Sequence, residues 1–267
     1  MSEKEIYSGP NFRYRPDKNN FTEKEGSEFF YYESGQLKAE YNYKNGKLDG
    51  FAREYYENGQ LIAEGNYSNG KLEGISKMYY ESGQLRSENS YKNNLLNGIS
   101  KTYYENGQIK MEVLRKNGKK DGIGKLYSTK GILVGEFPFK NDMLDGLVKK
   151  YNGVTGKLEI ESTYKNGKSE GLLKAYYPSG KLKSEENYKN DLREGLRKDY
   201  YENGVLKEER FYKNDKLEGI SKIYYPSGKV QIEASFKDNK LDGISREYDE
   251  TGKIIDQTEF KDNKQIN

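Results

Sequence analysis

A repeat of 24 residues is the feature that most constrains how this chain can fold. The segment YYENGQLIAEGNYSNGKLEG, from Tyr55 to Gly74, returns little changed as YYESGQLRSENSYKNNLLNG from Tyr79. A fixed period of this length decides the architecture, because each unit buries its surface against the next one. The units begin at Tyr31, Tyr55, Tyr79, Tyr103, Tyr127, Tyr151, Tyr176, Tyr200, Tyr224 and Tyr248, with one inserted residue in the unit that starts at Tyr151.

Each unit is expected to form a β-hairpin. Asn58-Gly59 is a strong signal for a two-residue type I′ turn, which needs positive φ at both residues. With that turn, Tyr55 faces Ile62 and Arg53 faces Glu64. Lys or Arg recurs at the position of Arg53, and Glu recurs at that of Glu64. Because opposite charges across antiparallel strands are favourable, the register predicts a row of alternating positive and negative side chains.

A second turn follows at residues 69–72. We expect a four-residue loop, which places Tyr67 opposite Gly74 and Glu64 opposite Lys77, so that the charge row continues from one hairpin to the next. A two-residue loop, which would stagger each unit by two residues, is the alternative. The four-residue loop is favoured because an aromatic ring lying over a cross-strand glycine is a recurrent arrangement in sheets.

The alternation of side chains predicts the fold class. It puts Ile75 and Lys77 on one face and Tyr67 on the other. We expect an all-β fold, an elongated single-layer antiparallel meander of about ten hairpins in which tyrosine rings and lysine stems cover the backbone. Residues 26–267 are expected to form one repeat domain, preceded by an N-terminal segment or cap at residues 1–25.

Composition excludes several kinds of site. The chain has no cysteine and no histidine, which removes disulfides, thiolate metal sites, the commonest general base and every Ser-His or Cys-His pair. The net charge of +3 gives no general attraction to nucleic acid or anionic lipid. The first residues, MSEKEIYSGPNFRYRP, contain no apolar run, so we expect no signal peptide or membrane span. Cytoplasmic localisation is then the default, with an envelope or secreted location if a signal sequence has been removed.

No cofactor, metal ion or catalytic activity is expected. Acidic segments such as KNDKLEG lack the alternating ligand spacing of a calcium loop. Carboxylate pairs recur in ten copies, and none of them stands out as an acid–base pair. Basic residues interleaved with tyrosine could suit single-stranded nucleic acid, but a glutamate row matches each basic row. A nucleic-acid partner is therefore not expected.

The repeat resembles a known family. Its pattern, Y-Y-x-N-G-x-L-x-x-E-x-x-Y-x-N-G-x-x-x-G, is similar over residues 26–267 to the variant MORN repeat (membrane occupation and recognition nexus) of bacterial YwqK-like proteins. The resemblance implies an elongated sheet of hairpins and a role as the antitoxin or immunity partner of a secreted toxin. The eukaryotic type of MORN repeat, implicated in membrane association and scaffolding, usually carries tryptophan. This chain has none, so a membrane-lipid partner is disfavoured.

The tyrosine rows and the irregular units are the candidate binding sites. Tyr offers a large rigid contact surface, although a sheet without a deep core needs the same rings to cover itself. Departures from the repeat gather in residues 113–156, where Arg115 replaces a tyrosine, Pro138 enters a strand and apolar side chains accumulate. A bend or a drifted repeat is the alternative explanation. The candidate partner-binding residues are Leu114, Arg115, Ile132, Val134, Phe137, Phe139, Tyr55, Tyr79 and Tyr103.

Ten similar hairpins without a unique polar cluster favour a non-enzymatic protein-binding role. The partner is expected to be a protein, with a cognate toxin as the candidate that the family resemblance implies. The alternative is a scaffold or cell-envelope-associated protein with several weak partners. The sequence leaves the oligomeric state open.

Overall fold

The computed structural model describes residues 24–266, which form 24 β-strands and no helix. Each strand pairs antiparallel with its neighbours in the chain, for example the strands at residues 37–44 and 47–55. The predicted all-β antiparallel meander is confirmed. The N-terminal segment predicted at residues 1–25 lies outside the described residues except for its last two.

The chain divides into two compact units. The first contains residues 24–133 and 139–142, and the second contains residues 134–138 and 143–266. The first unit holds β1 (Gly26–Tyr31), β2 (Leu37–Lys44), β3 (Lys47–Tyr55), β4 (Leu61–Ser68), β5 (Lys71–Tyr79), β6 (Leu85–Lys92), β7 (Leu95–Tyr103), β8 (Ile109–Lys116), β9 (Lys119–Lys120) and β10 (Gly122–Tyr127).

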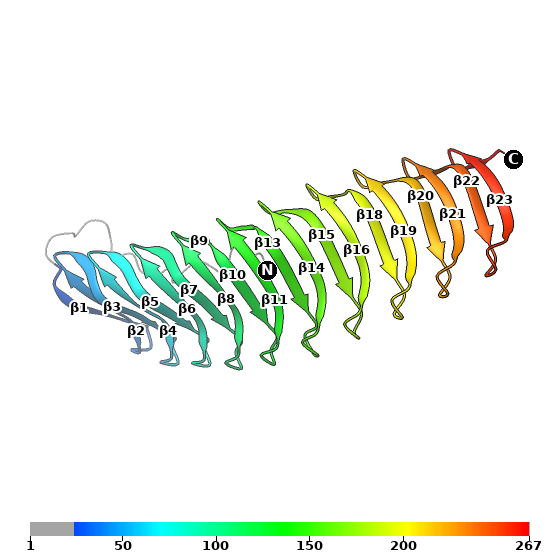
Figure 1. The fold of residues 1–267 in the computed structure, drawn as a ribbon. Helices are drawn as coiled ribbons and strands as arrows, with labels where there is room; N and C mark the ends of the chain where they lie inside the picture. The colour runs from blue at the N-terminus through cyan, green and yellow to red at the C-terminus, as the bar shows by residue number, and fades with distance from the viewer. Residues whose placement is uncertain (1–23, 267) are drawn as a thin grey trace. The chain divides into compact units, whose positions relative to one another are not determined.

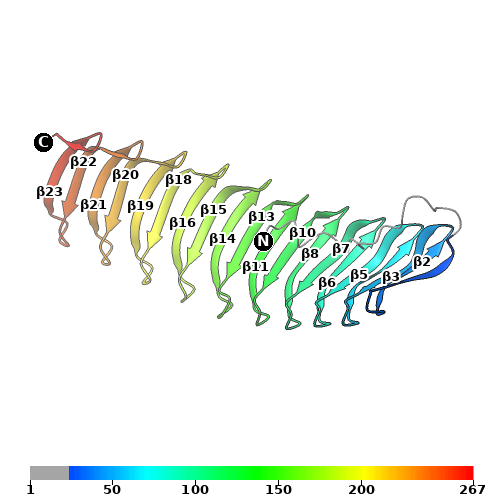
Figure 2. The same cartoon turned by 180° about the vertical axis from the view of Figure 1, so that it is seen from behind.

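Strand β11 (Leu133–Lys140) contributes residues to both units. The second unit holds β12 (Met143–Leu144), β13 (Gly146–Tyr151), β14 (Leu158–Lys165), β15 (Lys168–Tyr176), β16 (Leu182–Lys189), β17 (Leu192–Arg193), β18 (Gly195–Tyr200), β19 (Leu206–Lys213), β20 (Lys216–Tyr224), β21 (Val230–Lys237), β22 (Lys240–Tyr248), β23 (Ile254–Lys261) and β24 (Lys264–Gln265). Within each unit consecutive hairpins lie side by side, as the view from behind also shows (Figure 2).

The lower turns, Tyr56–Gln60 and its equivalents at the lower edge of Figure 1, differ from the prediction. The Tyr56 amide donates to the Gln60 carbonyl over 2.8 Å, and the Gly59 amide donates to the Tyr56 carbonyl over 2.9 Å. Gly59 has a φ of 84°. This is a three-residue loop, a type I turn followed by a left-handed glycine, and the predicted two-residue type I′ turn is wrong. The Asn58 carboxamide oxygen accepts the Gln60 amide over 2.9 Å, which stabilises the longer loop.

A bulge compensates for the longer loop. Tyr55 faces Leu61, and the register then shifts by one residue, so that Ile62 has no partner on the opposite strand. The predicted pairing of Tyr55 with Ile62 is therefore wrong. Beyond the bulge Arg53 faces Glu64, so the predicted charge pairing is confirmed.

The upper turns, Asn69-Gly70 and its equivalents, are the type I′ turns of this fold. Asn69 has a φ of 49° and Gly70 a φ of 77°, and Tyr67 faces Leu72. The predicted four-residue loop is wrong. Asn and Asp fill both positions in later units, for example Asn190 and Asp191, because their short polar side chains tolerate the left-handed region better than other residues do.

A register shift keeps the charge row level in spite of the shorter loop. The shift lies between the Asn66–Glu73 pair and the Glu64–Lys77 pair, and Gly74, within the extra residues, has a φ of 73°. The predicted pairing of Glu64 with Lys77 is thereby confirmed. An aromatic ring does oppose a glycine in this sheet, but Tyr67 faces Gly50 of its own hairpin.

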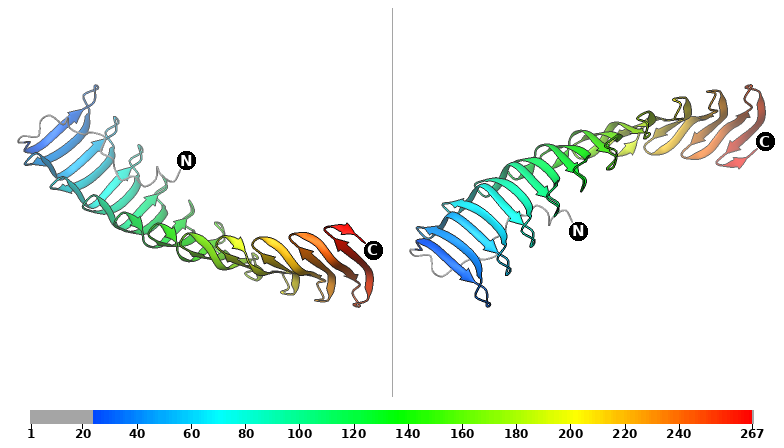
Figure 3. Two further views of the ribbon diagram at one scale, coloured as in Figure 1. Left: turned by 90° about the horizontal axis from the view of Figure 1, so that it is seen from above. Right: turned by 90° about the horizontal axis from the view of Figure 1, so that it is seen from below.

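The two faces of the strands differ in burial. We call the face that carries Ala52 and Ser76 the inner face, because both side chains are buried, and the face that carries Arg53 and Lys77 the outer face. Viewed from above and below, the strands of each unit form a single layer (Figure 3). The core therefore consists of inner-face side chains alone. One cluster contains Ala39, Tyr41, Tyr43 and Ala52, with Phe30, Leu48 and Tyr67 packed against it.

The inserted residue enlarges a lower turn and leaves the strands intact. The Asn152 amide donates to the Lys157 carbonyl over 2.8 Å, and the Gly156 amide donates to the Asn152 carbonyl over 2.8 Å. The Asn152 side-chain oxygen accepts the amides of Val154 and Thr155 at 3.0 and 2.9 Å. Four residues thus occupy a loop that elsewhere holds three.

Candidate protein-binding surface

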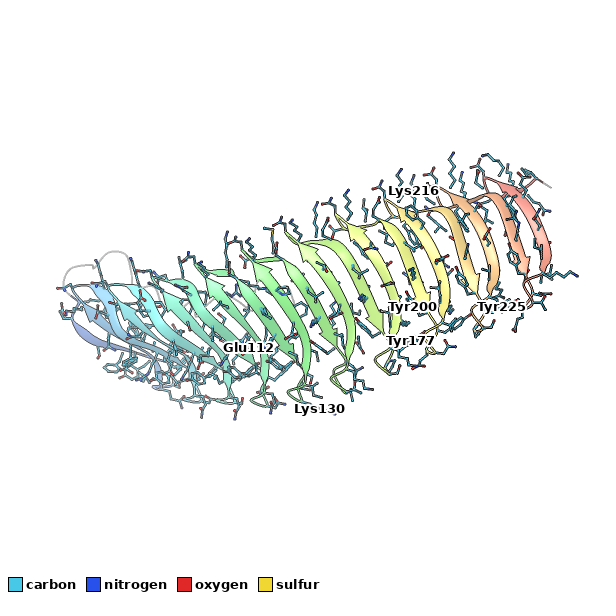
Figure 4. The ribbon with its side chains drawn as sticks, in the orientation of Figure 1. Glu112, Lys130, Tyr177, Tyr200, Lys216 and Tyr225 are labelled. Carbon is cyan, nitrogen blue, oxygen red and sulfur yellow. The ribbon has the colours of Figure 1, made fainter. Side chains whose placement is uncertain are left out.

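The second tyrosine of each Tyr-Tyr pair links neighbouring hairpins. The Tyr80 hydroxyl donates to the Tyr103 carbonyl over 2.8 Å, and the Tyr177 hydroxyl donates to the Tyr200 carbonyl over 2.6 Å. Tyr177 and Tyr225 lie near the lower turns in Figure 4. The same bond is made by Tyr32, Tyr56, Tyr104, Tyr201 and Tyr225. This row of hydroxyls therefore has a structural role in the sheet.

The first tyrosine of each pair lies on the outer face beside the glutamate row. The Tyr79 hydroxyl donates to Glu64 over 2.8 Å, and burial followed by the bond to Glu64 raises the pKa of Tyr79 well above its usual value. Burial, followed by the charge of Glu40, raises the pKa of Tyr55, and burial followed by the charges of Glu88 and Glu112 raises that of Tyr103. Of the three tyrosines predicted to recognise a partner, Tyr79 is thus bonded to a carboxylate of the sheet, and Tyr55 and Tyr103 are partly buried beside the same glutamate row.

These shifts predict unfolding in alkali. Burial and a bond to Glu161 raise the pKa of Tyr176 to about 12, and burial and a bond to Glu185 raise that of Tyr200 to about 12. The folded chain holds these protons above pH 10, where the unfolded chain releases them. Stability is therefore complete below the unfolded pKa of 10.0 and is lost as the pH rises from there to about 12.

Circular dichroism and tyrosinate absorbance across this pH range measure the effect. The double variant Tyr176→Phe, Tyr200→Phe should lose less stability over the same interval, because two of the linked protons are gone. A wild-type unfolding free energy that stays constant from pH 10 to pH 12 would contradict the expectation.

Arg53 shows the geometry of the charge row. Its Nη1 lies 3.6 Å from Glu40 Oε2, and its Nε lies 3.7 Å from Glu64 Oε2. Arg53 thus faces a glutamate in its own hairpin and another in the preceding one, whereas Arg246, in the last hairpin, faces Gln257 in place of the first. Because every charge has neighbours of opposite sign within the row, the row attracts neither polyanions nor polycations strongly.

Charge reversal tests this register. Lys77 faces Glu64 and Glu88, so Lys77→Glu should lower the free energy of unfolding by about 0.5–1 kcal/mol, as like charges oppose each other. Glu88→Lys alone should cost a similar amount, because the new lysine faces Lys77 and Lys101. The double variant restores the pair within the hairpin, so its loss should be smaller than the sum of the two single losses. Urea denaturation of the four proteins decides the matter: a double variant whose loss equals that sum would show that the two side chains do not interact.

The structure places two of the predicted irregular residues on opposite faces. Leu114 lies on the outer face with 46% of its side chain exposed. Arg115 lies on the inner face at 5% exposure, at the position of the repeated tyrosine, and its Nη1 lies 3.7 Å from Asp142 Oδ1. Of these two neighbours, only Leu114 is available to a partner without rearrangement.

The remaining predicted residues pack against glycines or belong to a turn. In the first unit, Phe139 packs over Gly124, and the Lys120 ammonium lies 4.7 Å from the centre of its ring. Also in that unit, the Ile132 carbonyl accepts the Ser128 amide over 2.8 Å within a lower turn. In the second unit, Phe137 packs over Gly135, and Val134 lies beside Gly153. Because glycine has no side chain, these glycines leave space beside the strand, and the larger side chains Phe139, Phe137 and Val134 fill it.

Sequence reasoning assigned no role to a row of exposed apolar side chains on the outer face. Each follows the glycine after an upper turn, which is the signal that could have found them. In the first unit the row contains Phe51, Ile75, Ile99 and Ile123, all more than half exposed, and in the second it contains Leu147, Leu196 and Ile220. Between Phe51 and Ile75 lies a hollow that Asn66 also lines. Exposed apolar side chains in a continuous row are typical of interaction surfaces.

The repeat geometry agrees with a family comparison. The model of the MORN repeat variant matches residues 24–45, 48–69, 72–93, 96–117, 169–190, 193–214, 217–238 and 241–262. The chain belongs to the MORN repeat variant family. The model of the standard MORN repeat matches residues 116–132. The interval between the two groups of variant matches, residues 118–168, contains most of the stretch in which the sequence departs from the repeat.

Other comparisons add little to the MORN assignment. No curated protein matches this chain significantly. Among solved structures, a TcdB2-TccC3-Cdc42 complex aligns at 13% identity with a TM-score of 0.22, and alternansucrase with isomaltononaose aligns at 15% with a TM-score of 0.23. The alignments cover 88% and 86% of this chain but only 15% and 16% of those chains. This MORN-repeat chain therefore spans about a sixth of their length, and likenesses at this level carry no functional information.

A charged cluster on the inner face of strands β16, β18 and β19 was missed by sequence reasoning. The Arg197 guanidinium donates to both carboxylate oxygens of Asp199 at 2.9 Å and lies 3.2 Å from Glu186. Arg210, directly opposite Arg197, forms an ion pair with Glu208. The equivalent of Arg197 is Ala52 in the third strand and Ser76 in the fifth, and this change of residue type was the available signal. Its two guanidinium groups are paired with three carboxylates, so the cluster distinguishes this part of the array without offering a free cation.

Two further properties of the described part bear on function. Residues 24–266 form no helix that is long and apolar enough to cross a bilayer. Within the same residues, no three Asp or Glu side chains gather in a way that could hold a metal ion.

Proposed function

We propose that this chain is a non-enzymatic protein-binding protein whose partner is a cognate bacterial toxin, which it neutralises as an antitoxin or immunity protein. The observation that carries the proposal is the contrast on the outer face. The repeated tyrosines and glutamates bond to the sheet itself, whereas the apolar row beside them is exposed. Apolar side chains rimmed by charges are typical of protein–protein interfaces.

The occupied carboxylates support a binding role over a catalytic one. Glu64, Glu112, Glu136, Glu161, Glu185 and Glu209 each accept a tyrosine hydroxyl from the neighbouring hairpin. A general acid or base must reach the substrate proton with a group that is free to exchange it. Since the sequence also lacks histidine and cysteine, these rows offer surfaces for recognition.

We propose that Leu114 determines which partner the chain binds. The equivalent positions in the two preceding hairpins hold Asn66 and Ser90. Leu114 faces Ile99 across the ladder, and both are about half exposed. This pair makes a wider apolar patch than the two preceding hairpins have, and Leu196 and Phe211 form a similar exposed pair in the second unit. The partner-binding role of the inward-facing Arg115 and Phe139 would then be to support the strand that carries Leu114.

Co-expression with the open reading frame beside this gene tests the function. We expect that product to arrest growth when expressed alone and this chain to restore growth. Leu114→Asp should weaken both the rescue and the affinity of the purified pair by about 1.4 kcal/mol or more, which is about tenfold. The matched control is Ile255→Asp, which alters another exposed isoleucine on β23.

The comparison applies to variants that remain folded by circular dichroism and thermal unfolding. An adjacent product that is harmless, or that this chain does not bind, would refute the antitoxin role. If Leu114→Asp binds as well as Ile255→Asp or Tyr80→Ala, Leu114 does not determine specificity.

A scaffold with several weak partners is the second candidate. It is favoured by the recurrence of the same apolar, lysine and glutamate positions in successive hairpins, which supports avidity. In that case single substitutions such as Leu114→Asp should cause small losses, and binding should fall stepwise as the substitution of exposed apolar residues is extended along the row.

A further inference from the structure

The outer face of strands β3–β8, in the first unit, alternates between large and short side chains. Phe51 faces Asn66 on the next strand, and Ile75 faces Ser90. Ile99 and Leu114 follow as a large pair. Phe51, Ile75 and Ile99 are 55%, 55% and 53% exposed. Apolar projections therefore alternate with the short side chains Asn66 and Ser90, and a hollow lies at the first of them.

The charge row alternates with the same period on the same strands. Its members, in order across β3–β8, are Arg53, Glu64, Lys77, Glu88, Lys101 and Glu112. Glu112 is labelled in Figure 4. Each basic residue is on a strand that carries an apolar projection, and Glu64 and Glu88 are on the strands that carry Asn66 and Ser90. Size and charge therefore change together from β3 to β7, whereas β8 carries the acidic Glu112 and the large Leu114.

We propose that this outer face binds the same face of a second copy of the chain, about a two-fold axis that runs parallel to the strands between β5 and β6. This operation sets β5 against the partner's β6 and β7 against the partner's β4, which are strands of opposite type. It also sets β3, with Phe51, against the partner's β8, where two large side chains meet. It sets Ile75 against the partner subunit's Ser90 and Ile99 against the partner subunit's Asn66. The same operation sets Lys77 against the partner subunit's Glu88 and Lys101 against the partner subunit's Glu64.

A second copy is favoured over other binding partners because a single placement of the two sheets matches both the apolar row and the charge row. A two-fold axis between neighbouring strands brings unlike charges together and places projections over short side chains at once. An identical sheet also has the same pitch of two strand spacings, about 9.6 Å, so both rows match over β4–β7 and the charge row matches over β3–β8. The heptad of an amphipathic helix advances about 10.5 Å and drifts out of step.

The interface is small and should be weak. Six strands span about 24 Å at about 4.8 Å per spacing, and packed sheets cross at about 30°, which concentrates contact near the axis. The lysines of the upper turns, such as Lys71 and Lys92, border the row and remain at its rim. The area falls at the low end of specific interfaces. We therefore expect a reversible monomer–dimer equilibrium in the purified chain, independent of any toxin.

Sedimentation velocity over a wide range of concentrations tests the association. The wild-type chain should shift reversibly from monomer to dimer as concentration rises. Ile75→Lys, next to the axis, should lower the association constant about tenfold or more, since an ammonium group is then buried opposite the partner's Ser90, between the partner's Ile75 and the partner's Ile99. Ile255→Lys removes a comparably exposed isoleucine (57%) outside this surface and should associate as the wild type does.

Cross-linking tests the register, because the chain contains no cysteine of its own. A Ser90→Cys chain mixed with an Ile75→Cys chain should form a disulfide-linked pair faster than a Ser90→Cys chain mixed with an Ile255→Cys chain. A wild-type chain that stays monomeric to its solubility limit, an Ile75→Lys chain that dimerises normally, or equal cross-linking rates would each overturn the proposal. These measurements use the chain alone, so they do not depend on the outcome of the toxin experiment.

Discussion

Replacing Tyr41 with alanine is expected to lower the free energy of unfolding by about 3–5 kcal/mol, the usual cost of truncating a large buried aromatic residue. Tyr41 is 2% exposed and lies in the inner-face cluster with Ala39 and Ala52. Its ring centre is 5.6 Å from that of Phe30, and its hydroxyl donates to Glu54 over 2.6 Å. Alanine would remove the ring and leave a cavity that flanking strands cannot close without distortion.

Tyr41→Phe is the matched control for that measurement. It keeps the ring and removes only the bond to Glu54, so it should cost about 1–2 kcal/mol. Urea denaturation gives both values. Hydrogen exchange should show the loss confined to β1–β4, because contacts in a repeat array join neighbouring units only. If Tyr41→Ala is no worse than Tyr41→Phe, the inner-face cluster does not form the core of this part of the chain.

Much of the hairpin array follows from local sequence. The period, the alternation of side chains and the pairing of Arg53 with Glu64 lead directly to an antiparallel meander, and these predictions are confirmed. They succeed because charge pairing and face alternation act between adjacent strands, whose side chains the register brings together. The family assignment succeeds for the same reason, since the repeat motif consists of turn and pairing residues.

The turn geometry could not be predicted from the dipeptides alone. Asn58-Gly59 and Asn69-Gly70 are the same pair of residues, yet the first lies in a three-residue loop and the second in a type I′ turn. The loop at Gly59 is one residue longer than predicted, and the bulge at Ile62 cancels the difference. The extra loop residue and the bulge together leave the pairing of Arg53 with Glu64 unchanged. The pattern of charges in the sequence therefore cannot distinguish the two-residue turn from the three-residue loop with a bulge.

The candidate site was predicted less well than the fold, because sequence proximity does not determine burial. Leu114 and Arg115 are adjacent, but strand alternation sends one outward to 46% exposure and the other inward to 5%. The exposed row that contains Ile75 was assigned to its face correctly. Its exposure depends on the absence of a second layer over the strands described here, and no property of a single hairpin determines that.

Gly98→Ala should cost about 2–4 kcal/mol, because two penalties coincide at this position. Gly98 has a φ of 118°, where a side chain is strained by about 1–3 kcal/mol. A Cβ there would also lie 2.8 Å from the Ser90 Cβ, closer than packed carbon atoms approach. The glycine follows an upper turn and allows the register shift that keeps Lys101 opposite Glu88.

Gly74 and Ser90 separate the two penalties. Gly74 is the equivalent residue one hairpin earlier, with a φ of 73° and no atom within 4 Å of an added Cβ, so Gly74→Ala should cost only about 1 kcal/mol. Ser90→Gly combined with Gly98→Ala removes the close contact and should regain part of the loss, while the backbone strain remains. Thermal and urea unfolding of the three variants give the comparison. Equal losses for Gly74→Ala and Gly98→Ala would mean that neither the wider φ nor the contact with Ser90 constrains this turn, and that any residue able to adopt a left-handed conformation can start the outgoing strand.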